Sequence, residues 1–314
     1  MTEKDDNEFL VRNSVDSSSV GPKSLPLKYK VVIIVVICLF VAGIIITAII
    51  LATRGDDSDN EQNGQKDNNS DDDGSDDDGG DDDDDEDQIE VLDPIIINPT
   101  SKYTHCIIWL HGLDNCPENF VNLFTKEVPF ARKENTKIIL MRAPYQITTF
   151  NKVNETSWFD LFTFPIDNSE CYNFTDAIRS RKMVEKIINQ EAKELNGKYR
   201  NIYVGGHSQG ACITLYTAYN FNETLGGVLV CSGILFPQGQ IVGDKTKLNV
   251  FLAHGDADKA IPFEFHKETV KRIENFEGVQ KKYYQGHGHN IADYEKNDMG
   301  KFLNDTMIDW SNIF

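Results

Sequence analysis

Apolar and polar positions follow two different periods over residues 91–314. Short runs of β-branched, aromatic and aliphatic residues, typical of buried strands, end in segments rich in Gly, Asp or Asn. Between several runs, apolar residues recur every three or four positions, most clearly over 175–195, which predicts amphipathic helices. Strands that alternate with helices favour an α/β fold with a mostly parallel sheet covered on both faces. The predicted strands are 106–110, 137–141, 202–204, 227–231, 250–253 and 282–284.

Two weaker helical patterns follow towards the C-terminus. A short helix is predicted after Pro262, which fixes the start of the segment. The final segment, 291–310, has a fainter apolar stripe, and Gly300 is a candidate break in it.

A different pattern lies near the N-terminus, where residues 31–53 form a run of 23 uncharged, mostly apolar residues. As a helix this run reaches about 34 Å, enough to cross the hydrocarbon core of a bilayer. Lys23, Lys28 and Lys30 precede it, and the positive-inside rule then places the tail, 1–30, in the cytosol. We therefore expect a single-pass signal anchor with residues 55–314 luminal or extracellular. Five Asn-x-Ser/Thr sequences beyond the run favour a glycoprotein.

The net charge of −19 is concentrated in one stretch. Residues 55–90 hold 19 acidic residues and one lysine, and cannot bury a core, so 54–90 is expected to be an extended, disordered linker. Residues 91–314 carry a net charge of only −2 and are numerous enough for one α/β domain with one core. This near-neutral balance gives no basic surface for nucleic acid, and we expect no such partner.

The sequence from Gly206 to Gly210 predicts a reactive serine. A strand-like run ends in Gly-His-Ser-Gln-Gly, and a helical pattern follows at once. This is the form of a nucleophile elbow, a sharp turn that exposes one side chain above the sheet. We therefore expect Ser208 to be a nucleophile, which requires an adjacent base and an acid that orients the base.

The acid and the base are expected after Ser208, in the order Asp or Glu and then His. Asp256 and Asp258 both follow the predicted strand 250–253; Asp258 stands four residues before Pro262 and is the preferred acid, while Asp256 is expected to hold loop backbone. His287 and His289 follow the last predicted strand, and His289 is the preferred base because it is nearer the final helix. A His-x-His pair could also bind a metal, but no Cys or carboxylate cluster accompanies it.

Acyl transfer also needs N–H donors directed at the developing oxyanion. One donor is expected to be the backbone N–H of Gln209, directly after the nucleophile. The other is expected from Leu113, in the loop after the first predicted strand, where Gly112 allows close approach.

Five separated motifs resemble, in order, those of the phospholipase/carboxylesterase family, which includes the acyl-protein thioesterases. The chain lacks the family's second glycine between Leu113 and Asp114, and His207 replaces the usual phenylalanine of the elbow. The resemblance implies an α/β-hydrolase fold, with the family's catalytic positions falling on Asp258 and His289. The motifs are His111-Gly112-Leu113-Asp114, Trp158-Phe159-Asp160, Gly206-His207-Ser208-Gln209-Gly210, His254-Gly255-Asp256-Ala257-Asp258 and Tyr284-Gln285-Gly286-His287-Gly288-His289.

The sequence thus predicts a membrane-anchored serine hydrolase that cleaves carboxylic esters or thioesters through an acyl-enzyme, without metal or other cofactor. The substrate is expected to be a lipid ester or an acylated protein or glycan on the luminal or outer side. Trp158 and Phe159 either line the acyl or alcohol pocket or pack in the core. Two alternatives stay open: transfer of the acyl group to an alcohol other than water, and a catalytically silent surface-binding protein with the same fold.

Overall fold

The computed structural model describes residues 92–307. The predicted tail, anchor and linker (1–30, 31–53 and 54–90) lie outside these residues. Within them, no helix combines the length and the apolar character needed to cross a membrane.

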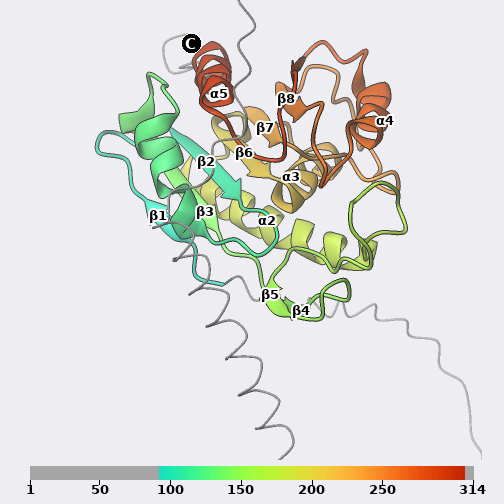
Figure 1. Ribbon diagram of the computed structural model, residues 1–314. Helices are drawn as coiled ribbons and strands as arrows, with labels where there is room; N and C mark the ends of the chain where they lie inside the picture. Colours follow the sequence, from blue (N-terminus) through green and yellow to red (C-terminus); the bar gives the residue numbers. More distant parts are fainter. Residues whose placement is uncertain (1–91, 308–314) are drawn as a thin grey trace, which may run out of the picture. The chain divides into compact units, whose positions relative to one another are not determined.

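A seven-stranded sheet forms the centre of the described region (Figure 1). All neighbouring strands are parallel except β1, which pairs antiparallel to β3 at one edge. This arrangement confirms the predicted, mostly parallel sheet. In spatial order the strands are β1 (Ile95–Ile97), β3 (Thr136–Met141), β2 (His105–Leu110), β6 (Ile202–His207), β7 (Gly227–Cys231), β8 (Val250–Gly255) and β9 (Val279–Tyr284).

Helices cover both faces of the sheet. Alternate strand residues point to opposite sides, so each face presents apolar side chains for the helices to bury. On one face Ile108, Val204 and Val230 pack with α2 (Phe174–Glu194) and α3 (Gln209–Asn220). On the other face the strand residues pack with η2 (Leu123–Glu127) and α5 (Asp293–Thr306). The two faces of the sheet thus have two separate hydrophobic cores. The remaining elements are η1 (Pro117–Phe120), η3 (Lys133–Asn135), η4 (Tyr199–Asn201), α4 (Phe263–Ile273) and the hairpin of β4 (Tyr145–Ile147) and β5 (Asn154–Thr156).

The predicted break in the last helix is wrong. Helix α5 continues through Gly300, which is buried. A Cβ on this residue would lie 2.3 Å from the backbone oxygen of Pro129, so the glycine allows close packing of the helix against the loop after η2.

The carboxyl ends of β2, β6, β8 and β9 carry the predicted site. Parallel pairing brings these ends to one edge of the sheet, where ligands bind in open α/β folds. The loops that follow the four strands contain Leu113, Ser208, Asp258 and His289 respectively.

Candidate active site

Ser208 occupies a strained turn between β6 and α3. Its φ is +59° and its ψ is −124°, a conformation that residues other than glycine rarely adopt. The turn is held on both sides, since Ser208 N donates to Cys231 O at 3.0 Å and Cys212 N donates to Ser208 O at 3.1 Å. A Cβ on Gly210 would lie 2.3 Å from Leu110 O, so only glycine lets α3 begin this close to the end of β2.

Ser208, His289 and Asp258 form a continuous hydrogen-bonded chain. The distance from Ser208 Oγ to His289 Nε2 is 2.7 Å, and that from His289 Nδ1 to Asp258 Oδ2 is also 2.7 Å. The side chain of Asp258 is fully buried, whereas that of His289 is 21% exposed. The structure therefore brings together the three residues that the sequence selected as nucleophile, base and acid.

The environment of Asp258 favours its ionised form. Burial alone raises the pKa of this carboxyl, but the hydrogen bond and charge of His289, with the N–H of Ile261, outweigh it and lower the pKa to about 2. Asp258 Oδ1 accepts from Ala260 N at 2.8 Å and Ile261 N at 3.0 Å. These bonds leave Oδ2 directed at His289.

His254 packs against the loop that carries Asp258. Its Nε2 donates to Ile261 O at 2.9 Å and lies 3.5 Å from Asp258 Oδ2. Its ring stacks on His266, with 4.1 Å between ring centroids. Burial lowers the pKa of His254, so the ring is neutral near pH 7 and packs within the loop.

His287, the alternative base, is engaged elsewhere. Its Nε2 lies 2.5 Å from Asn290 O and its Nδ1 lies 2.7 Å from Tyr294 Oη. Because a carbonyl accepts from Nε2–H, Nδ1 accepts from the tyrosine hydroxyl in the neutral ring. Both nitrogens are therefore occupied, and the geometry favours His289 over His287 as the partner of Ser208. Among the described residues, no group of three His, Cys, Asp or Glu side chains is arranged to hold a metal ion.

The loop after β2 is locked by His111. Ala143 N donates to His111 Nε2 at 3.1 Å, so Nδ1 carries the proton and donates to Gly112 O at 2.7 Å. Burial lowers the pKa of His111 to about 4, which keeps this tautomer neutral. These two hydrogen bonds hold the backbone immediately before Leu113, a half-buried residue.

Gln209 connects the elbow to the loop that carries Trp158. Its Oε1 accepts from Ser157 Oγ at 3.1 Å and Trp158 N at 3.0 Å, and its Nε2 donates to Phe159 O at 2.9 Å. The side chain is fully buried, while its backbone N–H begins α3 beside Ser208. Sequence reasoning selected Gln209 for the backbone alone and missed the side chain.

Trp158 and Phe159 pack in the core. Both are fully buried; Trp158 Nε1 donates to His111 O at 2.7 Å, and Phe159 packs edge-on against Phe236 and Tyr172. Neither presents side-chain surface to a substrate. Of the two interpretations of this pair, the structure therefore favours core packing over pocket lining.

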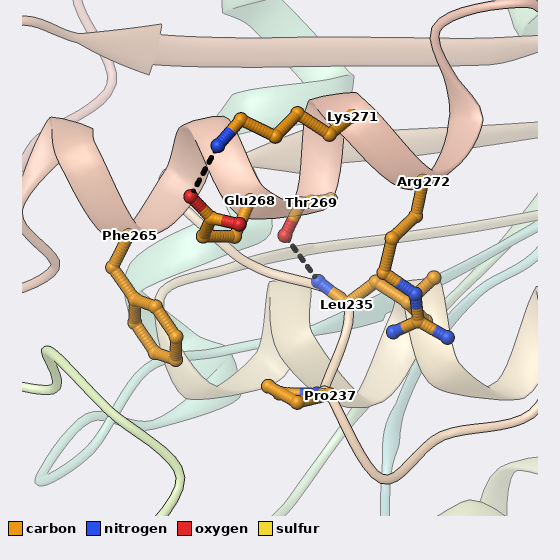
Figure 2. Close-up of a pocket in the computed structure, with 7 residues that line it drawn as sticks. All are labelled: Leu235, Pro237, Phe265, Glu268, Thr269, Lys271 and Arg272. Atoms are coloured by element: carbon orange, nitrogen blue, oxygen red, sulfur yellow. Dashed lines mark hydrogen bonds and ion pairs between the residues drawn. The ribbon is translucent and has the colours of Figure 1, made fainter.

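A separate surface pocket of about 320 Å³ lies against α4. Figure 2 shows Thr269 Oγ1 accepting from Leu235 N in its wall and Lys271 paired with Glu268 at its rim. The pocket contains none of the predicted site residues, so it adds no group to the chemistry at Ser208. Its lining residues are Leu235, Pro237, Phe265, Glu268, Thr269, Lys271 and Arg272.

The sheet order, the covering helices and the strand–Ser208–helix turn define an α/β-hydrolase. Residues 92–307 match the phospholipase/carboxylesterase family model, and the chain belongs to this family of ester-hydrolysing enzymes.

Relatives and solved structures agree with this assignment. The chain is 29% identical over 234 residues to "Acyl-protein thioesterase 1" of Mycosarcoma maydis, covering 68% of this chain and 97% of the relative. It is 28% identical to "Carboxylesterase SOBER1" of Arabidopsis thaliana, covering 60% and 85%. The crystal structure of the latter superposes with a TM-score of 0.60 at 25% identity, covering 65% of this chain and all of that one.

These findings correct the predicted localisation. We expected a single-pass membrane protein with its catalytic domain luminal or extracellular. The described residues contain no membrane-spanning helix, and the match to the acyl-protein thioesterase takes up 97% of that relative's length. The run on which the expectation depended, 31–53, lies outside the described residues.

Proposed function

We propose that this chain hydrolyses carboxylic esters or thioesters through an acyl-enzyme on Ser208. The observation that carries the proposal is the hydrogen-bonded chain from Ser208 Oγ through His289 to Asp258, with both links at 2.7 Å. A serine hydroxyl is a weak nucleophile at neutral pH, and an imidazole at this distance supplies the base that it needs.

In the first half-reaction, His289 Nε2 takes the proton of Ser208 Oγ as the oxygen attacks the acyl carbon. The bond to Asp258 Oδ2 keeps the proton of neutral His289 on Nδ1, which leaves the Nε2 lone pair free for this transfer. The ionised Asp258 then stabilises the imidazolium. Collapse of the tetrahedral intermediate passes the proton from Nε2 to the departing alcohol or thiol.

In the second half-reaction, water replaces the leaving group. His289 accepts a proton from the water as its oxygen attacks the acyl-enzyme, and returns it to Ser208 Oγ when the acid departs. The backbone N–H groups of Gln209 and Leu113 are the proposed donors to the oxyanion in both steps. The bonds of His111 and of the Gln209 side chain support this assignment by fixing the backbone that carries the donors.

The proposed substrates are acylated proteins or acyl lipids. The support is sequence similarity to relatives that are named acyl-protein thioesterases and carboxylesterases. Esters and thioesters share the acyl carbon that Ser208 would attack, so one site serves both.

The test compares the full-length chain with Ser208→Ala on a panel of short esters, long-chain thioesters and lysophospholipids. Removal of the nucleophile is expected to reduce kcat by at least about 10³-fold on every substrate that the wild type turns over. An active-site serine probe should label the wild type and not the variant. Turnover that persists in Ser208→Ala contradicts the proposal.

A further inference from the structure

His207 places a second imidazole beside the proposed nucleophile. The residue ends β6, directly before Ser208, and is partly exposed. Its ring lies against His289, with 4.9 Å between centroids and planes inclined at 45°. Its Nδ1 lies beside the loop after β2, 3.5 Å from where a Cβ on Gly112 would stand. The ring therefore lies between the base and the loop that would hold the oxyanion.

This imidazole is costly to the fold. Its Nε2 is buried and has no hydrogen-bond partner among the described residues. Burial, followed by the nearby His289, lowers the pKa of His207 to about 3, so the ring is neutral near pH 7. A phenyl ring of similar size would fill the same space without an unsatisfied buried nitrogen. An unsatisfied buried polar atom in a folded protein calls for an explanation, such as a functional role or a bound water.

The position of His207 identifies which part of a substrate it can meet. The departing alcohol or thiol takes its proton from His289 Nε2, so the leaving group must lie against His289. His207 is packed on that same imidazole and borders Ser208 along the chain. A hydroxyl or amide close to the scissile bond, on the leaving-group side, would be within reach of its Nδ1, since Nε2 is buried.

Resting on the proposed function, we infer that His207 selects substrates whose leaving group carries a hydrogen-bonding group within a few bonds of the scissile atom. Glycerol esters have such a hydroxyl, and S-acylated cysteine in a peptide has backbone amides at a similar separation. Simple alkyl esters and alkyl thioesters have neither.

The experiment uses two matched substrate pairs with the same acyl chain. One pair is monooctanoyl glycerol and propyl octanoate; the other is an S-octanoyl cysteine peptide and S-octanoyl propanethiol. For the full-length wild type, kcat/KM is expected to favour the polar member of at least one pair by about tenfold, the value of one hydrogen bond. The pair that shows the preference distinguishes the lipid source from the protein source.

Two variants assign the preference to His207. His207→Phe is expected to bring the ratio within a pair close to one, while His207→Gln, which keeps a hydrogen-bonding side chain, retains part of it. His207→Phe should also raise Tm by about 2–4 °C, because it removes the unsatisfied nitrogen. This gain shows that any loss of preference does not come from unfolding.

The outcomes separate this inference from the proposed function. Wild-type turnover of all four substrates without preference overturns the inference alone. An equal loss on both members of a pair in His207→Phe also overturns it, because the ring then acts only by positioning His289. A wild type that is folded yet hydrolyses none of the four overturns the proposed function, and the inference with it.

Discussion

The carboxylate of Asp256 accepts a hydrogen bond from the backbone N–H of Gly286, with 2.6 Å between Oδ1 and the nitrogen. This bond joins the loop after β8 to the loop after β9. A backbone bond from Ala257 N to His287 O, at 3.0 Å, runs beside it. The two loops carry Asp258 and His289, so Asp256 holds their backbones at a fixed separation. The sequence predicted a backbone role for Asp256, and the partner found is in the other loop.

Substitution of the two aspartates is expected to separate their roles. Asp258→Asn should lower kcat on any turned-over ester by about 10²–10⁴-fold, since an amide favours the wrong tautomer of His289. Asp256→Asn should retain most of kcat, because its amide oxygen can still accept from Gly286 N. Steady-state kinetics on one ester, with circular dichroism to verify folding, measures both. Equal losses in the two variants would contradict these assignments.

The turn at Ser208 is expected to tolerate no side chain at Gly210. In Gly210→Ala the new Cβ would lie 2.3 Å from Leu110 O and 2.4 Å from His111 O, both backbone atoms that cannot move without distorting β2. We expect a loss of about 3 kcal/mol or more in the free energy of unfolding.

Gly288→Ala is the matched control for this change. No atom lies within 4 Å of a Cβ at Gly288, and its φ is not in the left-handed region. Its stability, measured by urea unfolding, should stay within about 0.5 kcal/mol of the wild type. Similar losses in both alanine variants would count against a steric role for Gly210.

The sequence predicted those features that depend on local pattern. The inner strands β2, β3, β6, β7 and β8 carry dense apolar runs, and their alternate residues fill two cores, so their existence was visible without the structure. The edge strand β1 and the hairpin strands β4 and β5 were missed. Each has three residues and partly exposed side chains, and pairing with distant segments, rather than local pattern, forms them.

In the site, too, local features could be predicted and contacts between distant residues could not. Ser208, Asp258 and His289 could be selected because chain order and neighbouring turns are local information. The bonds of the Gln209 side chain join residues about 50 positions apart, and nothing in the sequence indicates them. The burial of Trp158 could not be predicted either, because an aromatic residue near a site looks the same whether it faces a ligand or the core.

The side chain of Gln209 is expected to matter separately from its backbone N–H. Gln209→Leu keeps the N–H beside Ser208 but leaves Trp158 N buried without a partner, and Phe159 O keeps only its bond from Ser157 Oγ. Unfolding free energy should fall by about 2–3 kcal/mol. The value of kcat should also fall, because the loop packed against the elbow is released.

The same substitution at an exposed glutamine provides the control for Gln209→Leu. Gln280 lies on β9 with its side chain exposed, and Gln280→Leu should change stability by less than about 0.5 kcal/mol. Denaturant unfolding and ester kinetics on both variants make the comparison. Unchanged stability in Gln209→Leu would show that its bonds contribute nothing net.

Buried histidines are expected to make stability depend on pH between about 6.5 and 4. Burial lowers the pKa of His266 from 6.5 to about 3, and the pKa of His111 and of His207 falls to between about 3 and 4 for the same leading reason. Below pH 6.5 the unfolded chain therefore binds protons that the folded chain does not. These histidines therefore leave the free energy of unfolding unchanged above about pH 6.5 and lower it as the pH falls towards their folded pKa values.

The expected slope is of the order of 1 kcal/mol per pH unit for each such histidine. Asp258, whose folded pKa is about 2, adds a further loss only below about pH 4, where the unfolded carboxyl takes up its proton first. Urea unfolding at pH 7, 6 and 5 measures the slope.

His266→Phe should reduce this slope by the contribution of one histidine, about 1 kcal/mol per pH unit, whatever its effect on absolute stability. Its imidazole is fully buried, donates from Nδ1 to Gly233 O at 2.9 Å, and has no partner for Nε2 among the described residues. Gln280→Leu should leave the slope unchanged. If the slope of His266→Phe equals that of the wild type, His266 is protonated equally in the folded and unfolded chains, and its burial does not control the acid sensitivity of the fold.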